Sequence, residues 1–359
     1  MAEPLKNLYT RELVERLGCE IVSVWPKFDS AAFVERVFSD SWDELELKGR
    51  MARISETLHC FLPKGYKRSL GILLKVAPRC EGFQYMFFPD FVEKYGIDEY
   101  DLSVAALEVL TERFSAEFAV RPFIVRYPEK MMAQMKRWAA SKNEHVRRLA
   151  SEGCRPRLPW AMALPVFKVD PAPVLAILKK LKADDSEYVR RSVANNINDI
   201  SKDHPDVVID IARSWMGKRE RTDRLIKHAC RTILKRGNSE VLGLFGYQSP
   251  KHVGIDKLVV AKSVEWGGAL EFSFVLKTLK GRIGKLRIEY GIDFMKSNGR
   301  LSRTIFKISE ADFQLSEKQV VRRHPFKPIS TRKYYAGTHG VAIILNGEEV
   351  ANGAFELIM

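Results

Sequence analysis

The sequence predicts a mainly α-helical protein in which a solenoid of two-helix repeats is followed by a small all-β sandwich. Three observations carry this prediction. Apolar residues recur at helical spacing from Met1 to about Tyr247, an 11-residue pattern repeats within that stretch, and alternation with period two begins after about Gly246. A chain of 359 residues favours at least two domains, so we expect one domain over residues 1–246 and another over residues 247–359.

The repeat lies in the middle of the chain. NEHVRRLASEG begins at Asn143, SEYVRRSVANN at Ser186 and a weaker copy, TDRLIKHACRT, at Thr222. The corresponding basic residues are 43 and then 37 positions apart, and a period of about 40 is typical of HEAT-like or armadillo-like solenoids. Ser186 or Thr222 is expected to cap its helix. The repeats should line up basic residues as a track for phosphates: Arg147, Arg148, Arg190, Arg191 and Lys227.

The C-terminal part reads as strands. The segments 270–276, 286–294 and 339–357 alternate with period two, and Asn346–Gly347 is a strong hairpin signal. About seven short strand candidates fit in this region, which indicates a small sandwich of the immunoglobulin-like kind. The Cys…Trp…Cys pattern of antibody domains is missing, which excludes a true antibody-type domain.

The net charge of +14 is concentrated in the middle third of the chain. Residues 121–240 carry +12, residues 1–120 carry −5 and the remainder carries +7. Such a concentration is the expected footprint of a polyanion-binding surface, and the alternative is a well-solvated surface.

Several function classes lack support in the sequence. The N-terminus resembles an amphipathic helix more than a signal peptide, and no apolar run is long enough to span a membrane. Five scattered cysteines indicate a reducing cytoplasm and argue against disulfides or structural zinc. No HExxH, no GxxxxGK[ST] and no nucleophile-elbow motif occurs, so we expect no metal and no cofactor.

Three motifs stand out against a plain solenoid: AEFAVRPFI (residues 116–124), ASEGCRPRLPW (150–160) and RRSVANNINDISKDHP (190–205). Together they resemble the DNA alkylation-repair glycosylases of the AlkC kind, relatives of the AlkD-type HEAT-like glycosylases. The resemblance covers about residues 1–246, and some members of that family also carry a C-terminal immunoglobulin-like domain. It implies a bacterial, intracellular enzyme that excises cationic N3-alkylated bases, chiefly 3-methyladenine, without metal or cofactor. It also implies that the lesion is held without a deep base-flipping pocket.

The same resemblance places residues in roles. Glu117, Trp160 and Asp199 fall on active-site positions, and Arg148 and Arg155 fall on positions that hold the DNA backbone, with Arg157 in the same arginine cluster. The chemistry is consistent with the residue types. A cationic base leaves without a strong general acid, so carboxylates need only stabilise an oxocarbenium-like sugar and position water. A tryptophan offers a cation–π face.

Each candidate residue has a structural alternative. Asp199 could cap a helix or pair with Lys202, and Glu117 could pair with Arg121 one turn away. Trp160 could belong to the core, and the arginines could form a solvated face. Glu152 could orient Arg148 or Arg155, and we keep it outside the catalytic set.

The predicted function is therefore a DNA N-glycosylase that acts as a monomer on alkylated bases in double-stranded DNA, with no membrane and no obligate protein partner. One alternative is a non-catalytic HEAT-repeat scaffold that binds nucleic acid. Another is a solenoid adaptor whose β-sandwich binds protein partners, which would show little salt dependence of DNA binding.

Overall fold

The structure is a computed structural model that describes residues 4–278, 280–329 and 332–359. The helices of the described residues are η1 (Leu5–Leu8), α1 (Arg11–Val24), α2 (Ser30–Val37), η2 (Trp42–Glu44), α3 (Leu47–Phe61), α4 (Tyr66–Val76), η3 (Ala77–Arg79), η4 (Phe83–Tyr85), α5 (Phe87–Tyr95), α6 (Tyr100–Leu110), α7 (Val120–Arg126), α8 (Pro128–Trp138), α9 (Glu144–Glu152), α10 (Pro165–Val169), α11 (Ala172–Leu181), α12 (Glu187–Ile200), α13 (Pro205–Trp215), α14 (Glu220–Ala229), α15 (Arg231–Lys235) and α16 (Ser239–Leu244). The strands are β1 (Val253–Val260), β2 (Ser263–Glu265), β3 (Ala269–Thr278), β4 (Gly284–Met295), β5 (Leu301–Phe313), β6 (Glu317–Pro325), β7 (Gly337–Leu345) and β8 (Glu348–Ile358).

The chain divides into two compact units. The first runs up to His204 and also includes Gly217–Ala229, and the second comprises Pro205–Met216 and Cys230–Met359. Helices α1–α12 and α14 therefore belong to the first unit, whereas α13, α15 and α16 belong with the strands. Among the described residues, no helix is both long and apolar enough to cross a membrane.

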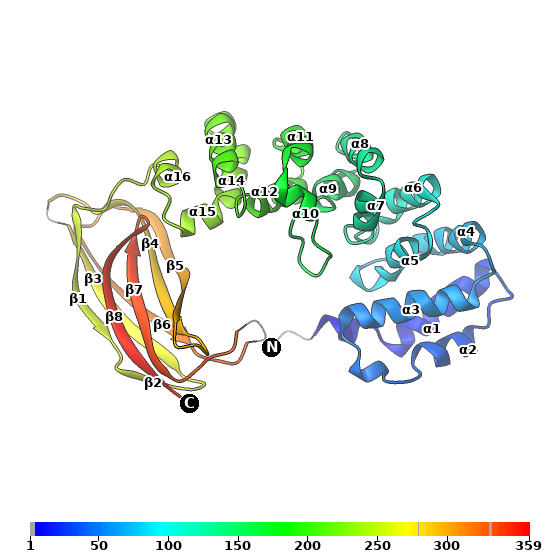
Figure 1. Ribbon diagram of the computed structural model, residues 1–359, viewed down its shortest axis with the longest axis horizontal. Helices are drawn as coiled ribbons and strands as arrows, with labels where there is room; N and C mark the ends of the chain where they lie inside the picture. The colour runs from blue at the N-terminus through cyan, green and yellow to red at the C-terminus, as the bar shows by residue number, and fades with distance from the viewer. Residues whose placement is uncertain (1–3, 279, 330–331) are drawn as a thin grey trace. The chain divides into compact units, whose positions relative to one another are not determined.

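In the first unit, each α-helix packs on helices that are next to it or two or three α-helices away in the chain (Figure 1). Helix α1 packs on α2, α2 on α3, α3 on α5, α7 on α8, α8 on α9, α9 on α12 and α12 on α14. Most of the residues expected to form apolar stripes are buried, among them Phe33, Val34 and Val37 of α2 and Val104 and Leu107 of α6. Val109, which was expected on the α6 stripe, is instead 56% exposed. The predicted helical-repeat fold is confirmed.

Helix starts agree only in part with the predicted caps. Asn143 Oδ1 accepts a hydrogen bond from the His145 N–H at 2.8 Å, as an N-cap residue does. Ser186 occupies the N-cap position of α12 but makes no side-chain cap bond, because its hydroxyl contacts the Glu144 carboxylate instead. The Thr222 cap was wrong: α14 begins two residues earlier, and the Thr222 hydroxyl donates to the Lys182 carbonyl at 3.4 Å.

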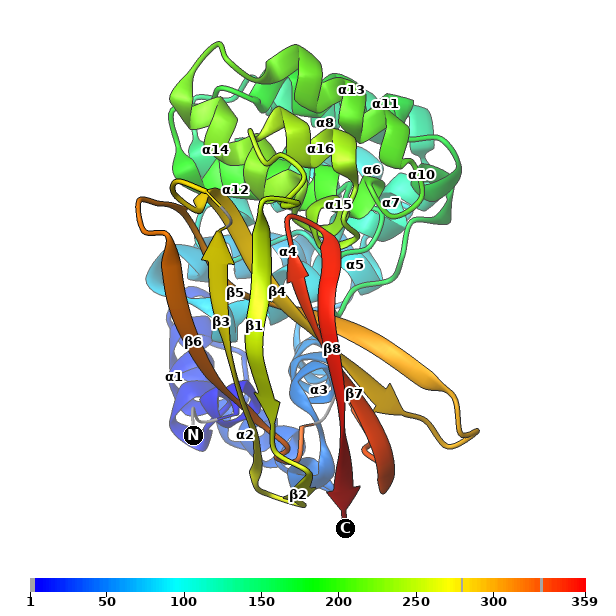
Figure 2. The same ribbon diagram turned by 90° about the vertical axis from the view of Figure 1, so that its left-hand side faces the viewer.

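The second unit contains the predicted sandwich, whose strands Figure 2 shows from one side. One sheet has the order β1-β3-β6 and the other has the order β2-β8-β7-β4-β5. All pairs are antiparallel except β2 with the last strand, β8, which are parallel. The predicted hairpin is confirmed, since Asn346 (φ 44°) and Gly347 (φ 83°) form the turn between β7 and β8.

Candidate active site

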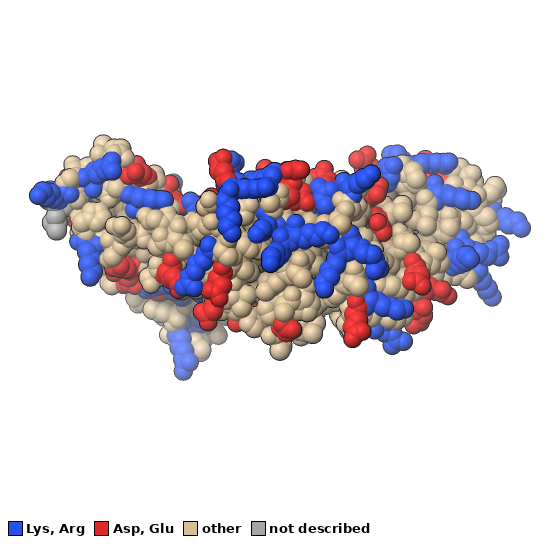
Figure 3. All heavy atoms as spheres, turned by 90° about the horizontal axis from the view of Figure 1, so that it is seen from above, with Lys and Arg blue, Asp and Glu red and all other residues tan. Residues whose placement is uncertain are grey.

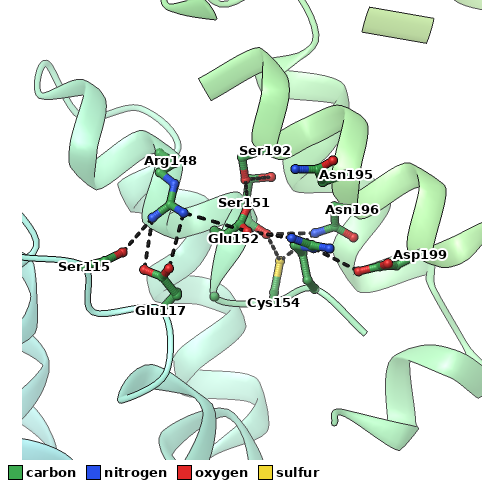
Figure 4. A network of polar contacts seen from close by, with 12 residues as sticks. Ser115, Glu117, Arg148, Ser151, Glu152, Cys154, Ser192, Asn195, Asn196 and Asp199 are labelled. Carbon is green, nitrogen blue, oxygen red and sulfur yellow. Dashed lines mark hydrogen bonds and ion pairs between the residues drawn. The ribbon is translucent and has the colours of Figure 1, made fainter. Parts of the chain in front are cut away.

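A row of alternating carboxylates and guanidinium groups lies in the first unit (Figure 4). Glu117 comes from the segment between α6 and α7, Arg148 and Glu152 lie one turn apart on α9, Arg155 follows that helix, and Asp199 lies in the last turn of α12. Glu117, Glu152, Arg155 and Asp199 are each at most 9% exposed. Residues that are far apart in the sequence are thus brought into one buried polar network.

Glu117 forms the first ion pair of this row. Its carboxylate accepts two hydrogen bonds from Arg148, at 3.0 and 3.3 Å, and the Ser115 hydroxyl accepts a third at 2.7 Å. Arg121, the partner that helical spacing suggested for Glu117, instead binds main-chain carbonyls. Burial alone would lower the pKa of Arg148, but the neighbouring carboxylates of Glu117 and Glu152 raise it overall.

Glu152 joins the two halves of the row. Its Oε1 lies 2.6 Å from Arg155 Nη1 and 3.8 Å from Arg148 Nη2, and its Oε2 accepts a hydrogen bond from the Ser192 hydroxyl at 2.6 Å. Glu152 therefore contacts both arginines that the sequence allowed it to orient.

Asp199 forms the other end of the row. Its Oδ2 accepts a hydrogen bond from Arg155 Nε at 2.9 Å, and its Oδ1 lies 3.4 Å from Lys202 Nζ. The pair with Lys202 that the sequence suggested is therefore present, alongside a shorter one with Arg155. Burial alone would lower the pKa of Arg155, but Glu152 and Asp199 raise it overall.

Trp160 is displayed on a loop and is not part of the core. Its side chain is 60% exposed, which contradicts the core-packing alternative. Its φ of 63° lies in the left-handed region of backbone conformation, which residues other than glycine rarely adopt. The ring borders a hollow of about 460 Å³ whose other walls include Pro4, Leu5 and Leu47.

The arginines predicted to form a phosphate track have partners within the protein. Arg147 and Arg190 occupy equivalent places, as the repeat predicts, and each Nη1 donates to the carbonyls six and five residues earlier. Each of these two arginines therefore stabilises the loop that precedes its own helix. Arg157 pairs with Asp203 at 2.6 Å and Arg191 with Glu187 at 3.0 Å.

A basic cleft lies between α12 and α14, and of the residues that line it the sequence predicted only Arg190 and Arg191 as phosphate-binding. Its volume is about 560 Å³. Five basic residues line it: Arg190, Arg191, Arg221, Arg224 and His228. The last three were not singled out, although their spacing of three and four places them on one helical face. Basic side chains also predominate over acidic ones on the face shown in Figure 3.

No group of three or more His, Cys, Asp or Glu within the described ranges is arranged to hold a metal ion. The side chains of the candidate site are carboxylates, guanidinium groups and the exposed indole of Trp160. Such a set can stabilise a cation, orient a water molecule and bind phosphates.

Comparisons with known proteins identify the family of this chain. A family model described as "DNA alkylation repair enzyme" matches residues 114–232, and one for the C-terminal Ig-like domain of "Uncharacterised protein YhaZ" matches residues 255–359. "Uncharacterized protein YhaZ" of Bacillus subtilis (strain 168) is 45% identical over 346 residues, which cover 96% of each chain. The structure of Pseudomonas fluorescens alkylpurine DNA glycosylase AlkC bound to DNA containing an abasic site analog is 37% identical, with a TM-score of 0.93 over 99% of this chain and 100% of that one.

The helical repeats, the immunoglobulin-like domain and these matches together place the chain among the DNA alkylation-repair enzymes. The chain belongs to the AlkC kind within that family, as the three sequence motifs predicted.

Proposed function

We propose that this protein hydrolyses the N-glycosidic bond of cationic alkylated bases, chiefly 3-methyladenine, in double-stranded DNA. The observation that carries the proposal is that the first unit contains two buried, ion-paired carboxylates, Glu117 and Asp199, and also the exposed indole of Trp160. The likeness to an alkylpurine DNA glycosylase supports it. Acidic residues on a DNA-binding face weaken binding, so their presence favours a chemical role over a purely structural one.

In this mechanism the substrate supplies much of the reactivity. A base with an alkylated N3 carries positive charge, so its bond to the sugar breaks without a strong general acid. Asp199 then stabilises the oxocarbenium-like sugar and positions the attacking water, and Glu117 assists. Trp160 offers its ring face to the cation, an interaction worth about 0.5–2 kcal/mol. No deep base-flipping pocket is required, because a cationic lesion pairs and stacks poorly.

The arginines around the carboxylates bind phosphates of the DNA backbone. Arg155 uses Nε and Nη1 for Asp199 and Glu152, and its Nη2 makes no hydrogen bond to any described residue. That N–H group can bind a phosphate without breaking either ion pair. In the α12–α14 cleft, the pairs made by Arg191, Arg221 and Arg224 are exposed and weak, so phosphates can compete for these guanidinium groups.

The proposal is tested by release of free bases from methylated duplex DNA by the purified protein alone, with and without a chelator. We expect release of 3-methyladenine that the chelator does not change. Release from single-stranded DNA alone would contradict the duplex preference. DNA binding that weakens with salt, without release of any base, would instead favour a non-catalytic HEAT-repeat scaffold.

A further inference from the structure

The loop that displays Trp160 is held at its main chain by side chains from other helices. It joins α9 to α10 and carries Arg155 and Arg157 as well as Trp160. A positive φ at a tryptophan persists only where the surroundings fix the backbone. Side chains of α7 and α3 make contacts that can fix this loop.

Arg121 of α7 supplies the first contact. Its Nε donates to the Met162 carbonyl at 2.7 Å, and its Nη1 donates to the carbonyls of Gly153 at 3.0 Å and Arg155 at 2.9 Å. One guanidinium group thus joins both ends of the loop.

Arg121 has no carboxylate partner among the described residues, although it is fully buried. Its Nη2 is buried without a hydrogen bond, and burial lowers its pKa to about 10. The carboxylates of Asp199 and Glu152 act on it only at longer range, and a buried cation without a directly paired anion is costly. Its presence here indicates that holding these three carbonyls has a use beyond packing, since a neutral side chain would fill the space at lower cost.

Lys48 of α3 supplies the second contact. Its Nζ donates to the carbonyl of Trp160 itself at 3.1 Å and lies 5.5 Å from the centroid of the Phe118 ring. Arg121 therefore binds the main chain on both sides of Trp160, and Lys48 binds the carbonyl of Trp160 itself.

We propose that Arg121 and Lys48 are positioning residues that preorganise the Trp160 loop so that the indole faces the substrate. Neither residue touches the reacting atoms. The proposal rests on the proposed function, because it assumes that the position of the Trp160 ring affects the rate of the chemical step of base release. Fixing the ring before the substrate binds would raise the rate of that step without changing the affinity for DNA.

A double-mutant cycle tests the role of Lys48. Lys48→Met should lower the single-turnover rate of base release by about tenfold in the wild-type background, with DNA affinity unchanged. In a Trp160→Ala background the same change should lower the rate by less than about twofold, because no ring remains to be positioned. Lys67→Met, on an exposed lysine of α4, is the matched control and should have no effect. Equal losses in both backgrounds would overturn the proposal.

A second measurement does not depend on activity. The protein is labelled with 5-fluorotryptophan, and the Trp160 resonance is assigned with the Trp160→Phe variant. Lys48→Met and Arg121→Lys should shift and broaden that resonance and increase hydrogen exchange in residues 153–164, whereas Lys67→Met should not. An unchanged resonance in both variants would overturn the anchoring. If the wild-type protein releases no base but the resonance responds as expected, the proposed function fails and the anchoring stands.

Discussion

Arg155 donates from Nε to Asp199 and from Nη1 to Glu152, so one guanidinium group joins the carboxylate proposed for catalysis to the buried centre of the row. Arg155 holds the Asp199 side chain through one of its two carboxylate oxygens, Oδ2. Among the described residues, the other oxygen of Asp199 contacts only Lys202, at 3.4 Å, and the side chain of Lys202 is 38% exposed. Asp199 is thus oriented by one partner while its second oxygen can still respond to a substrate.

Asp199→Asn should abolish base release and leave DNA affinity unchanged or raised. The amide keeps the shape of the side chain and can still accept from Arg155, but it cannot stabilise a cationic sugar. Removing a negative charge from a DNA-binding face favours binding. Base release from methylated DNA and DNA affinity at fixed salt check the two halves. Loss of affinity would mean that Asp199 has a structural role.

Glu152→Ala should lower the free energy of unfolding by about 3 kcal/mol, because it leaves two largely buried arginines with one carboxylate fewer between them. Urea unfolding of the full chain measures the change. Glu187→Ala is the matched control, since it also removes the acid of an arginine pair, but an exposed one, and should cost less than about 1 kcal/mol. Equal costs for the two variants would contradict the buried network.

Substitution of the cleft arginines should reduce the salt dependence of DNA binding. Arg191→Ala and Arg224→Ala should each lower the slope of log affinity against log salt concentration by about 1, as expected for one lost phosphate contact. Arg11→Ala on α1, which also breaks an exposed arginine–carboxylate pair, is the control and should leave the slope unchanged. Equal slopes for all four proteins, wild type included, would remove the cleft from the interface.

The elements of the fold could be predicted because they depend on local patterns. The 43-residue spacing of Arg147 and Arg190 correctly placed them at equivalent positions, and Asn346–Gly347 correctly predicted a hairpin. What the pattern does not contain is the direction of a long side chain. The side chains of Arg147 and Arg190 extend back to the loop before their own helix. There they donate hydrogen bonds to backbone carbonyl oxygens, which need hydrogen-bond donors.

The partners within the site were harder to predict. Helical spacing suggested that Glu117 pairs with Arg121, but its partner Arg148 lies 31 residues away. Arg121 and Lys48 bind carbonyl oxygens, which every residue has, so no residue type at the acceptor marks the contact. For Arg121, the one available signal is an arginine within the apolar run AVRPFIV. For Lys48 the sequence contains none.

Stability should fall as the pH rises from about 5 to 8, in part through Glu93 of α5. Burial, and then the nearby charge of Asp90, raise the pKa of Glu93 to about 7 from the ordinary 4.5. The folded state therefore holds a proton that the unfolded state has released, so this contribution is complete below about pH 4.5 and is lost as the pH rises through 7. Unfolding free energies at pH 5 and 8 should show a loss of about 2 kcal/mol that Glu93→Gln largely removes. The same pH dependence in Glu93→Gln would assign it to other groups.

The turn between α15 and α16 approaches the β7–β8 hairpin so closely that two glycines are required within the second unit. A Cβ on Gly347 would lie 2.6 Å from Gly237 Cα and 2.7 Å from Leu242 Cδ1. Gly347→Ala should therefore lower the free energy of unfolding by about 2–4 kcal/mol, combining backbone strain with the clash. Gly267→Ala is a matched control, because its φ of +87° is close to the +83° of Gly347 and its Cβ would meet nothing within 4 Å. Gly267→Ala should cost only the strain, about 1 kcal/mol. Thermal and urea unfolding of both variants measure the difference, and equal losses would show that the hairpin and the helical turn do not pack as described.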